Sequence, residues 1–202
     1  MPETKSYRER HPFFDNALLL FGFVVVFWAI ELIDLIPGLR LDEHGVIPRE
    51  SIGLFGIFSA PFLHGDWTHL IGNTVPFLVL GGLVMLNGKK TFIVVTFISA
   101  VVAGLGIWLF ARSHTNHIGA STLIFGYLGF LLLVAWFSRD WRRALIAIVA
   151  CFLYGGLVFT LFRFKEGISW HGHVFGFVGG GFAAWLIAGD KGRKARSAPI
   201  VV

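Results

Sequence analysis

The side chains in this sequence that could do chemistry are histidines and one serine, and they stand at the starts of three apolar runs. They are His64, His69 and Asn73 near the start of 67–87, Ser121 near the start of 119–137, and His171 and His173 near the start of 170–189. Serine is a weak nucleophile until a base takes its proton, and histidine does this best near neutral pH. Ser121 and His173 are therefore predicted to act as nucleophile and general base.

Acyl transfer by a serine also needs donors for the negative charge that develops on the carbonyl oxygen. His69 and Asn73 are four residues apart, so on a helix they lie on one face, and both can donate. The backbone N–H groups near Ser121 fall in the first turn of a helix, where they have no intrahelical partner. Gly119 lets the chain approach a ligand closely before the serine. We expect these groups to form an oxyanion and substrate-binding site.

The elements that must position these residues are transmembrane helices. The chain has 202 residues, of which 55% are hydrophobic and 14% charged, and its mean hydropathy is +0.74. Such a composition excludes an ordinary soluble domain. Six apolar runs are close to the roughly 20 residues that cross a bilayer, which predicts an all-α integral membrane bundle of six helices. The runs are 17–36, 67–87, 91–111, 119–137, 142–162 and 170–189.

Basic residues predict how the bundle sits in the membrane. Twelve of the 17 Lys and Arg residues lie in the N-terminal segment, the second and fourth loops and the C-terminal tail. Basic residues concentrate in cytoplasmic segments, so both termini are predicted to be cytoplasmic. The predicted organisation is a cytoplasmic segment at 1–16, a membrane domain at 17–189 and a basic cytoplasmic tail at 190–202. The first run has no small-residue cleavage site beyond it and is expected to remain as a helix.

This orientation places the polar residues at a common depth. The second, fourth and sixth helices would each enter from the outer side, so that the site opens to the outer side of the membrane. The net charge of +5 is explained by topology, with some attraction to anionic membrane lipid, and predicts no nucleic-acid partner.

Glycines should let the helix of the base approach the helix of the nucleophile. Gly176 and Gly180 share a helical face with His173 and form a small-xxx-small pair, a pattern that allows close helix contact. Gly126 and Gly129 have no side chain, so the helix that begins at Ser121 can be approached closely at these positions. His171, two residues from His173, would point away from it and is assigned to the loop side.

Four motifs in this order resemble the rhomboid family of intramembrane serine proteases, in its minimal six-helix bacterial form. They are Ser59-Ala-Pro-Phe-Leu-His64, His69-Leu-Ile-Gly-Asn73, Gly119-Ala-Ser121 and His173-Val-Phe-Gly176-Phe-Val-Gly-Gly180. The resemblance implies a Ser121–His173 dyad, an oxyanion site of His69, Asn73 and the Ser121 N–H, and a supporting role for His64. It implies single-span transmembrane proteins as substrates, no cofactor, and a bacterial plasma membrane with the site open to the periplasmic side. It also implies a gate formed by the fifth helix and the loop before the sixth.

Two positions depart from the family pattern. Phe125 stands where many relatives have a tyrosine that stacks on the base; a ring remains, so we expect the stacking to survive without the hydroxyl. The first loop has Phe55-Gly56 near the place of a common Trp-Arg pair, which alters the packing expected of that loop.

Other interpretations stay open at this point. The protein could be an inactive rhomboid-like chaperone or binding protein, a transporter, or a membrane protein in which His64, His69, His171 and His173 ligate a metal or haem. The lone Cys151 excludes an intramolecular disulfide and leaves a Cys/His metal cluster without its sulfurs, and no metal is expected. Loop residues His114 and His117, and Glu31 and Asp34 near the outer end of the first helix, are expected to be solvated.

Overall fold

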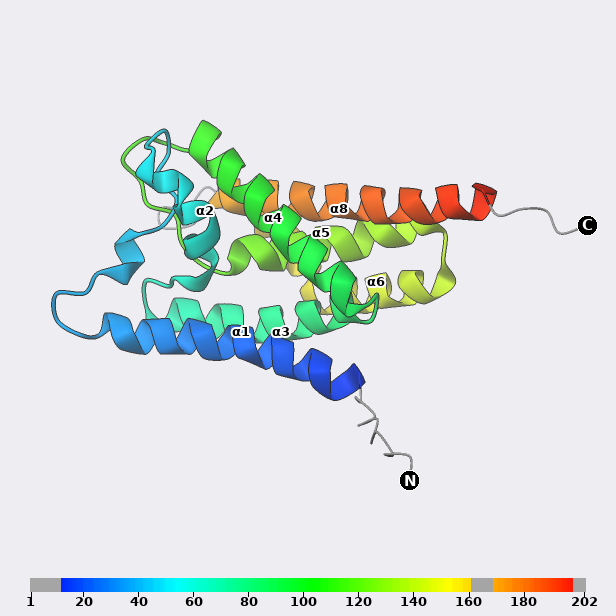
Figure 1. Cartoon of the computed structure of the whole chain (residues 1–202), viewed down its shortest axis with the longest axis horizontal. Coiled ribbons are helices and arrows are strands. Elements are labelled where there is room, and N and C mark those ends of the chain that lie inside the picture. Colours follow the sequence, from blue (N-terminus) through cyan, green and yellow to red (C-terminus); the bar gives the residue numbers. More distant parts are fainter. Residues whose placement is uncertain (1–11, 161–168, 198–202) are drawn as a thin grey trace, which may run out of the picture.

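The computed structural model describes residues 12–160 and 169–197, which form a bundle of helices (Figure 1). The long helices are α1 (Pro12–Asp34), α3 (Trp67–Met85), α4 (Lys89–Phe110), α5 (Ser121–Ser138), α6 (Trp141–Tyr154) and α8 (Trp170–Ser197), with a short α7 (Gly156–Thr160). Between α1 and α3 lie η1 (Leu41–Glu43), η2 (Ile52–Leu54), α2 (Gly56–Ser59) and η3 (Ala60–Phe62).

Five of these helices are long and apolar enough to cross a membrane: α1, α3, α4, α5 and the part of α8 up to Gly189. The prediction of an all-α integral membrane bundle is confirmed. The expected fifth span, 142–162, is divided in the structure, because α6 ends at Tyr154 and α7 begins at Gly156. A count of six spans stays a prediction.

The start of α1 and the end of α8 can be compared with the predicted domain boundaries. The start of α1 and the end of α8 lie at the same end of the bundle (Figure 1). α1 begins at Pro12 rather than 17, and α8 continues to Ser197, past the predicted start of the tail. Residues 1–11, 161–168 and 198–202 lie outside the described residues, so much of the predicted N-terminal segment and the loop before α8 do too. The side of the membrane that the termini face stays a prediction.

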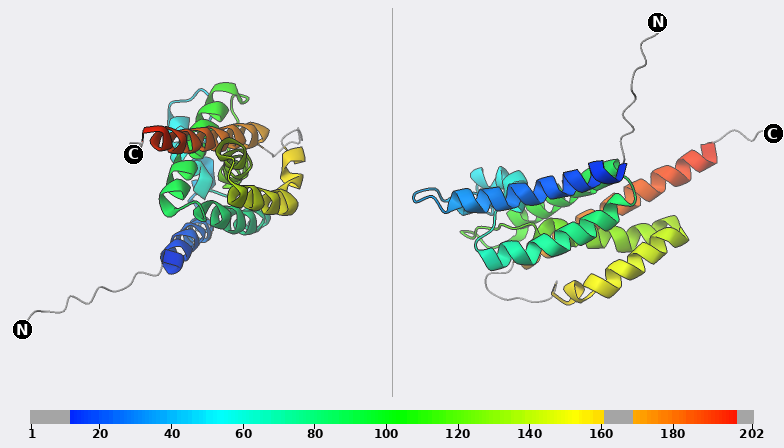
Figure 2. Two further views of the ribbon diagram at one scale, coloured as in Figure 1. Left: turned by 90° about the vertical axis from the view of Figure 1, so that its right-hand side faces the viewer. Right: turned by 90° about the horizontal axis from the view of Figure 1, so that it is seen from below.

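α5 is the central helix of the bundle. Its sequence has no charged residue, and a helix that is apolar on all sides is expected to be buried. Figure 2 shows it enclosed by α3, α4, α6 and α8, and it packs against all four. The apolar core around it includes the fully buried Tyr127, whose hydroxyl is 2.9 Å from Thr96 Oγ1. The residue at the start of α5 is thus held by the most enclosed element of the fold.

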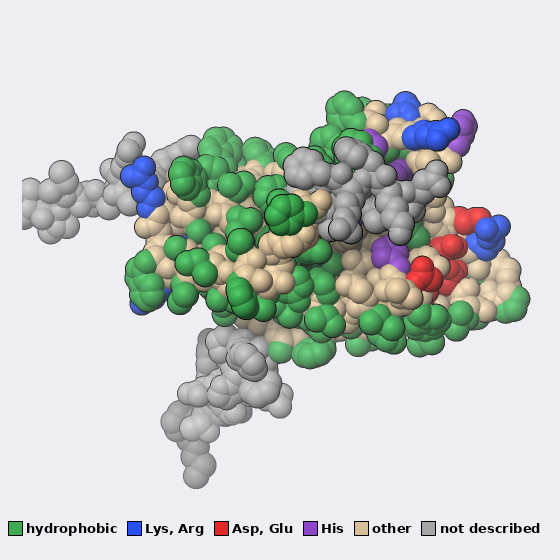
Figure 3. All heavy atoms as spheres, turned by 180° about the vertical axis from the view of Figure 1, so that it is seen from behind, with side chains coloured by type: hydrophobic (Ala, Val, Ile, Leu, Met, Phe, Trp, Pro, Cys, Tyr) green, Lys and Arg blue, Asp and Glu red, His purple; other side chains and the backbone are tan. Residues whose placement is uncertain are grey.

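α1 lies at the edge of the bundle and packs mainly on α3. On the face that Figure 3 shows, apolar side chains are spread along the length of the bundle, while acidic and histidine side chains gather toward one end. The expectation that Glu31 is solvated is wrong, because only 8% of the residue is exposed. Leu20, Phe27 and Glu31 are seven and four residues apart, so Glu31 shares the helix face that α1 turns inward.

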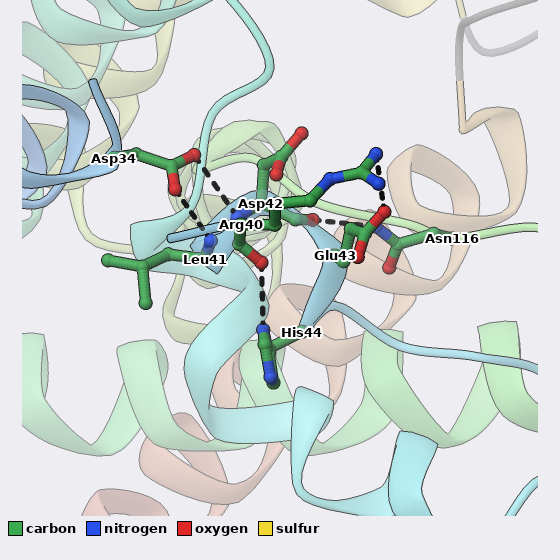
Figure 4. A network of polar contacts seen from close by, with 7 residues as sticks. All are labelled: Asp34, Arg40, Leu41, Asp42, Glu43, His44 and Asn116. Carbon is green, nitrogen blue, oxygen red and sulfur yellow. Dashed lines mark hydrogen bonds and ion pairs between the residues drawn. The ribbon is translucent and has the colours of Figure 1, made fainter. Parts of the chain in front are cut away.

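The first loop, residues 35–66, is a folded segment held by polar contacts. Asp34, also expected to be solvated, instead accepts hydrogen bonds from Leu41 N (2.6 Å) and Asp42 N (3.3 Å) at the end of α1. The Asn116 amide donates to the Asp42 carbonyl at 2.6 Å, which ties the loop to the segment before α5 (Figure 4). At Phe55-Gly56, where the first loop was predicted to depart from the family pattern, Phe55 is exposed. A Cβ on Gly56 would collide with the Gly45 backbone. The loop is therefore closely packed at that glycine.

A second set of contacts joins the first loop to the segment between α4 and α5. Val46 and His117 pair through an isolated antiparallel bridge. The Arg49 guanidinium donates to the Ala111 carbonyl at 2.7 Å and to Ser113 Oγ at 2.6 Å. These contacts fix the loop over the segment that leads into α5.

Candidate functional site

Ser121 and His173 lie in direct contact. Ser121 is the first residue of α5 and His173 lies in the first turn of α8, and Ser121 Oγ is 3.1 Å from His173 Nε2. This is within the hydrogen-bond reach required of a nucleophile and its base. Residues 52 apart in sequence thus meet because two helices begin at the same depth and pack side by side.

The close approach of α5 and α8 depends on glycine. A Cβ on Gly176 would collide with the Thr122 carbonyl, and a Cβ on Gly180 would collide with the Gly126 carbonyl. Both obstacles are main-chain atoms, which cannot move aside by changing rotamer. The predicted close contact between these helices is confirmed, and it puts the two main chains next to each other one turn from the Ser121–His173 contact.

Phe125 stacks on the imidazole of His173, with ring centroids 4.1 Å apart and planes at 20°. Phe125 lies one turn after Ser121 on α5, so the same helix carries Ser121 and the ring that holds the imidazole of His173. His173 is only 9% exposed, and its Nδ1 has no hydrogen-bond partner among the described residues. The expected stacking is present, and packing rather than a carboxylate orients this imidazole.

Gly119 lies beside the candidate oxyanion residues. Its φ of +113° falls in a region that side chains rarely adopt, and its N–H donates to the Ala60 carbonyl at 2.8 Å. An added Cβ would lie 2.6 Å from His69 Nε2 and 3.6 Å from Asn73 Nδ2. Both side chains therefore face the turn that precedes Ser121, as their shared helix face predicts.

Asn73 has an available donor at this place. Only 6% of the residue is exposed, and its Nδ2 has no hydrogen-bond partner among the described residues. A buried amide without a partner costs free energy, so such groups are expected to serve a ligand or a reaction. The cap of α5 offers donors too, because Ala120 at its N-cap makes no side-chain capping bond.

His64 supports this arrangement from behind. Its ring packs edge-on against His69 at 5.1 Å, and its Nε2 lies 3.5 Å from the Ala120 N–H. Burial, and next the neighbouring His69, lower the pKa of His64 from 6.5 to about 4. His64 is thus neutral at neutral pH and can accept a hydrogen bond, whereas a charged His64 would repel the amide.

The expectation that His117 is a solvated loop residue is wrong. His117 Nδ1 is 2.7 Å from Ser169 Oγ, and its Nε2 is 2.8 Å from Thr115 Oγ1. Burial, and next His171, lower the pKa of His117 from 6.5 to about 4. His114 is exposed as expected. His117 links the segment before Ser121 to the residue before α8.

Ser169 is a residue of this region to which no role was predicted. Its Oγ accepts from the Gly172 N–H at 3.3 Å, and its carbonyl accepts from the His173 N–H at 3.2 Å. A serine three residues before a helical N–H is the usual N-cap pattern, which was the available sequence signal. His171 stacks on Trp170.

The histidines do not gather into a ligand set. Among the residues that the structure describes, no group of three or more His, Cys, Asp or Glu side chains could hold a metal ion. His64 and His69 contact each other, and His173 instead contacts Ser121. The four-histidine arrangement of the metal or haem hypothesis is therefore not formed by this geometry.

Comparisons with known proteins agree with this architecture. The family model for the rhomboid domain matches residues 52–190. An uncharacterized protein of Mycobacterium tuberculosis is 42% identical over 183 residues, which cover 87% of this chain and 76% of that protein. A Bacillus subtilis protein whose name describes it as a rhomboid protease is 29% identical over 138 residues, which cover 65% of this chain and 66% of that protein. The chloroplastic rhomboid-like protein 11 of Arabidopsis thaliana is 30% identical over 134 residues, which cover 61% of this chain and 46% of that protein.

Proposed function

Because this chain belongs to the rhomboid family of intramembrane proteins, we propose that it is a serine endopeptidase that cleaves single-span transmembrane proteins in or near the bilayer. The observation that carries the proposal is the 3.1 Å separation of Ser121 Oγ and His173 Nε2. A packing role for Ser121 would explain neither this contact nor the unpartnered amide of Asn73 nearby.

Each group of the site has a defined role in the proposed reaction. Ser121 Oγ adds to the scissile carbonyl while His173 Nε2 accepts its proton, and the imidazolium then protonates the leaving amine. The oxyanion receives hydrogen bonds from Asn73, His69 and the Ser121 N–H. Water then hydrolyses the acyl-enzyme, with His173 again as base. Phe125 keeps the imidazole plane fixed through both steps.

The substrate must reach this site from the lipid and must expose a peptide bond. A helical carbonyl is hydrogen-bonded along its own helix, so residues that break the substrate helix should raise the rate. We propose that α6 and α7 form the gate, because they are interrupted at Gly155 and α6 exposes Phe152 and Leu153. The other part of the expected gate, the loop at 161–168, lies outside the described residues. An engineered crosslink between α3 and α6 should suppress cleavage of membrane substrates.

Location and orientation belong to the same proposal. The protein is an integral membrane protein, and we place it in a bacterial plasma membrane with both termini cytoplasmic and the dyad near the outer side. The segment 1–16 and the tail 190–202 would then be cytoplasmic. Accessibility of single cysteines introduced at the two ends of the bundle would test this orientation in intact cells.

The test of the proposed activity is a set of matched variants. Ser121→Ala and His173→Ala should each abolish cleavage of a membrane substrate and labelling by a fluorophosphonate. Ser138→Ala at the other end of α5, and His171→Ala beside the base, should retain both. Substantial cleavage by folded Ser121→Ala would refute the dyad. A folded wild-type protein that binds transmembrane segments without cleaving or labelling would instead indicate an inactive relative.

A further inference from the structure

A groove on the far side of the bundle from α6 has no part in the proposed reaction. It has a volume of about 570 Å³ and is lined by Asp15, Leu18, Leu19, Gly22, Phe23, Val26, Phe62 and Lys89. Most of its wall is α1, and Lys89 comes from the start of α4. α4 diverges from α1 along the bundle (Figure 1), so α1 packs on α3 and leaves its other side open. The groove therefore faces lipid.

The dimensions of the groove match one lipid chain. From Asp15 to Val26 a helix rises about 16 Å at about 1.5 Å per residue, which is roughly half of the 30 Å hydrocarbon core of a bilayer. Its wall beyond the first turn of α1 is apolar, and a Cβ on Gly22 would meet nothing within 4 Å. The space thus accepts an acyl chain of a single leaflet.

Both charged residues of the groove lie at one end of it. Asp15 stands in the first turn of α1, and Lys89 is the first residue of α4. The ion pairs found within the described residues include neither of them. A lone positive charge would favour any anionic lipid, whereas one charge of each sign complements a headgroup that carries both.

The position of Lys89 itself calls for an anion. Lys89 and Lys90 begin a helix of 22 residues whose first turn has no acidic residue and whose N-cap, Gly88, offers no side chain. A helix N-terminus carries partial positive charge, so lysines there are unfavourable unless a negative group lies close by. A phosphate at this place would receive hydrogen bonds from the lysine and from the free N–H groups of the first turn.

We propose that this groove binds a phospholipid with a primary ammonium headgroup of the phosphatidylethanolamine type. Its phosphate lies at Lys89 and the start of α4, its ammonium donates to the Asp15 carboxylate, and one acyl chain lies along Leu18, Gly22 and Phe23. A quaternary ammonium has no N–H to donate, and an anionic headgroup without an amine leaves Asp15 facing a negative charge. The site should therefore prefer phosphatidylethanolamine to phosphatidylcholine and phosphatidylglycerol.

Native mass spectrometry of the full-length protein in detergent, with the three lipids at equal concentration, tests the preference. The wild type should retain phosphatidylethanolamine above the other two. Lys89→Gln should weaken retention about two- to fivefold, as expected for loss of one exposed charge pair, and Asp15→Asn should remove the preference over phosphatidylglycerol. Lys90→Gln, the same charge change at a residue that does not line the groove, should weaken retention less than Lys89→Gln does.

Gly22→Leu distinguishes lipid binding in the groove from attraction of lipid to the surface charges. A Cβ at Gly22 would meet nothing within 4 Å, so a leucine there should extend into the groove and displace phosphatidylethanolamine. Gly189→Leu, at a position with the same open space around its Cβ, should retain the lipid. Equal binding of all three lipids, or retention that Gly22→Leu and Lys89→Gln leave unchanged, would overturn the proposal. Fluorophosphonate labelling of Ser121 is read separately in each variant, so loss of the lipid site and loss of the proposed activity are distinguished.

Discussion

Replacing Gly176 by alanine should separate the two halves of the dyad. An added Cβ would lie 3.1 Å from the carbonyl carbon of Thr122 and 3.3 Å from its Cα, and it would overlap the carbonyl oxygen. Carbon atoms in ordinary contact are about 3.5–4.0 Å apart. Since the obstacle is main chain, α8 must move away from α5 by about 0.5–1 Å.

The expected effect on the reaction follows from that shift. Ser121 precedes Thr122 on the same turn, so its distance to His173 Nε2 should grow from 3.1 Å to about 3.6–4.1 Å, beyond the roughly 3.2 Å limit for proton transfer. A misplacement of about 1 Å can cost about 10²-fold in rate. The overpacking should also destabilise the fold by about 1–3 kcal/mol.

The assay compares the rate of fluorophosphonate labelling in detergent with the rate of substrate cleavage in vesicles, with Tm as a check on folding. Gly189→Ala is the matched control, because it lies on the same helix and its Cβ would meet nothing within 4 Å. If folded Gly176→Ala reacts at the wild-type rate, the close main-chain contact does not set the dyad distance, and the reasoning is refuted.

Three further outcomes are expected. Asn73→Ala should lower kcat, but by less than the roughly 10²–10³-fold loss expected for a sole oxyanion donor, because His69 remains. Slower fluorophosphonate labelling with an unchanged Tm would support this role. An unchanged kcat would remove Asn73 from the proposed oxyanion site. The pKa values of His64 and His117 are about 4 when folded and about 6.5 when unfolded, so the unfolded chain binds more protons between these values. Stability should therefore fall as pH drops from 6.5 to 4, by at most about 3 kcal/mol for each histidine, and a Tm that is the same at pH 7 and 4.5 would contradict this. Arg49→Ala removes the hydrogen bonds to Ala111 and Ser113 and should lower the free energy of unfolding by about 1–2 kcal/mol. Arg40→Ala, which removes an exposed ion pair with Glu43, should leave Tm nearly unchanged. Equal Tm values for the two variants would show that the Arg49 contacts do not stabilise the fold.

Several features of the site could be predicted because they follow from spacing on single helices. His69 and Asn73 share a face at a separation of four residues, and Gly176 and Gly180 share a face with His173. Phe125 lies one turn after Ser121, which places its ring beside whatever Ser121 contacts. These relations depend only on helix geometry, and the membrane requires the helices themselves.

The remaining features depend on contacts between segments that the sequence does not specify. His117 is partly buried because Val46 of the first loop pairs with it, and nothing near either residue indicates that pairing. Glu31 is buried because of how α1 turns toward α3, which requires the packing to be known. The break at Gly155 lies within an apolar run. Hydropathy does not locate it, whereas the Gly155-Gly156 pair is a local signal that the chain could flex there.

The glycine contacts between α5 and α8 have a consequence for how the protein responds to its bilayer. Since main-chain atoms at Gly176 and Gly180 set the spacing of the two helices, that spacing does not depend on the side chains that face lipid. A change in bilayer thickness or lateral pressure acts first on peripheral elements such as α1 and α6. For the proposed protease, membrane composition should therefore alter how often a substrate enters, while the chemistry after entry keeps its intrinsic rate.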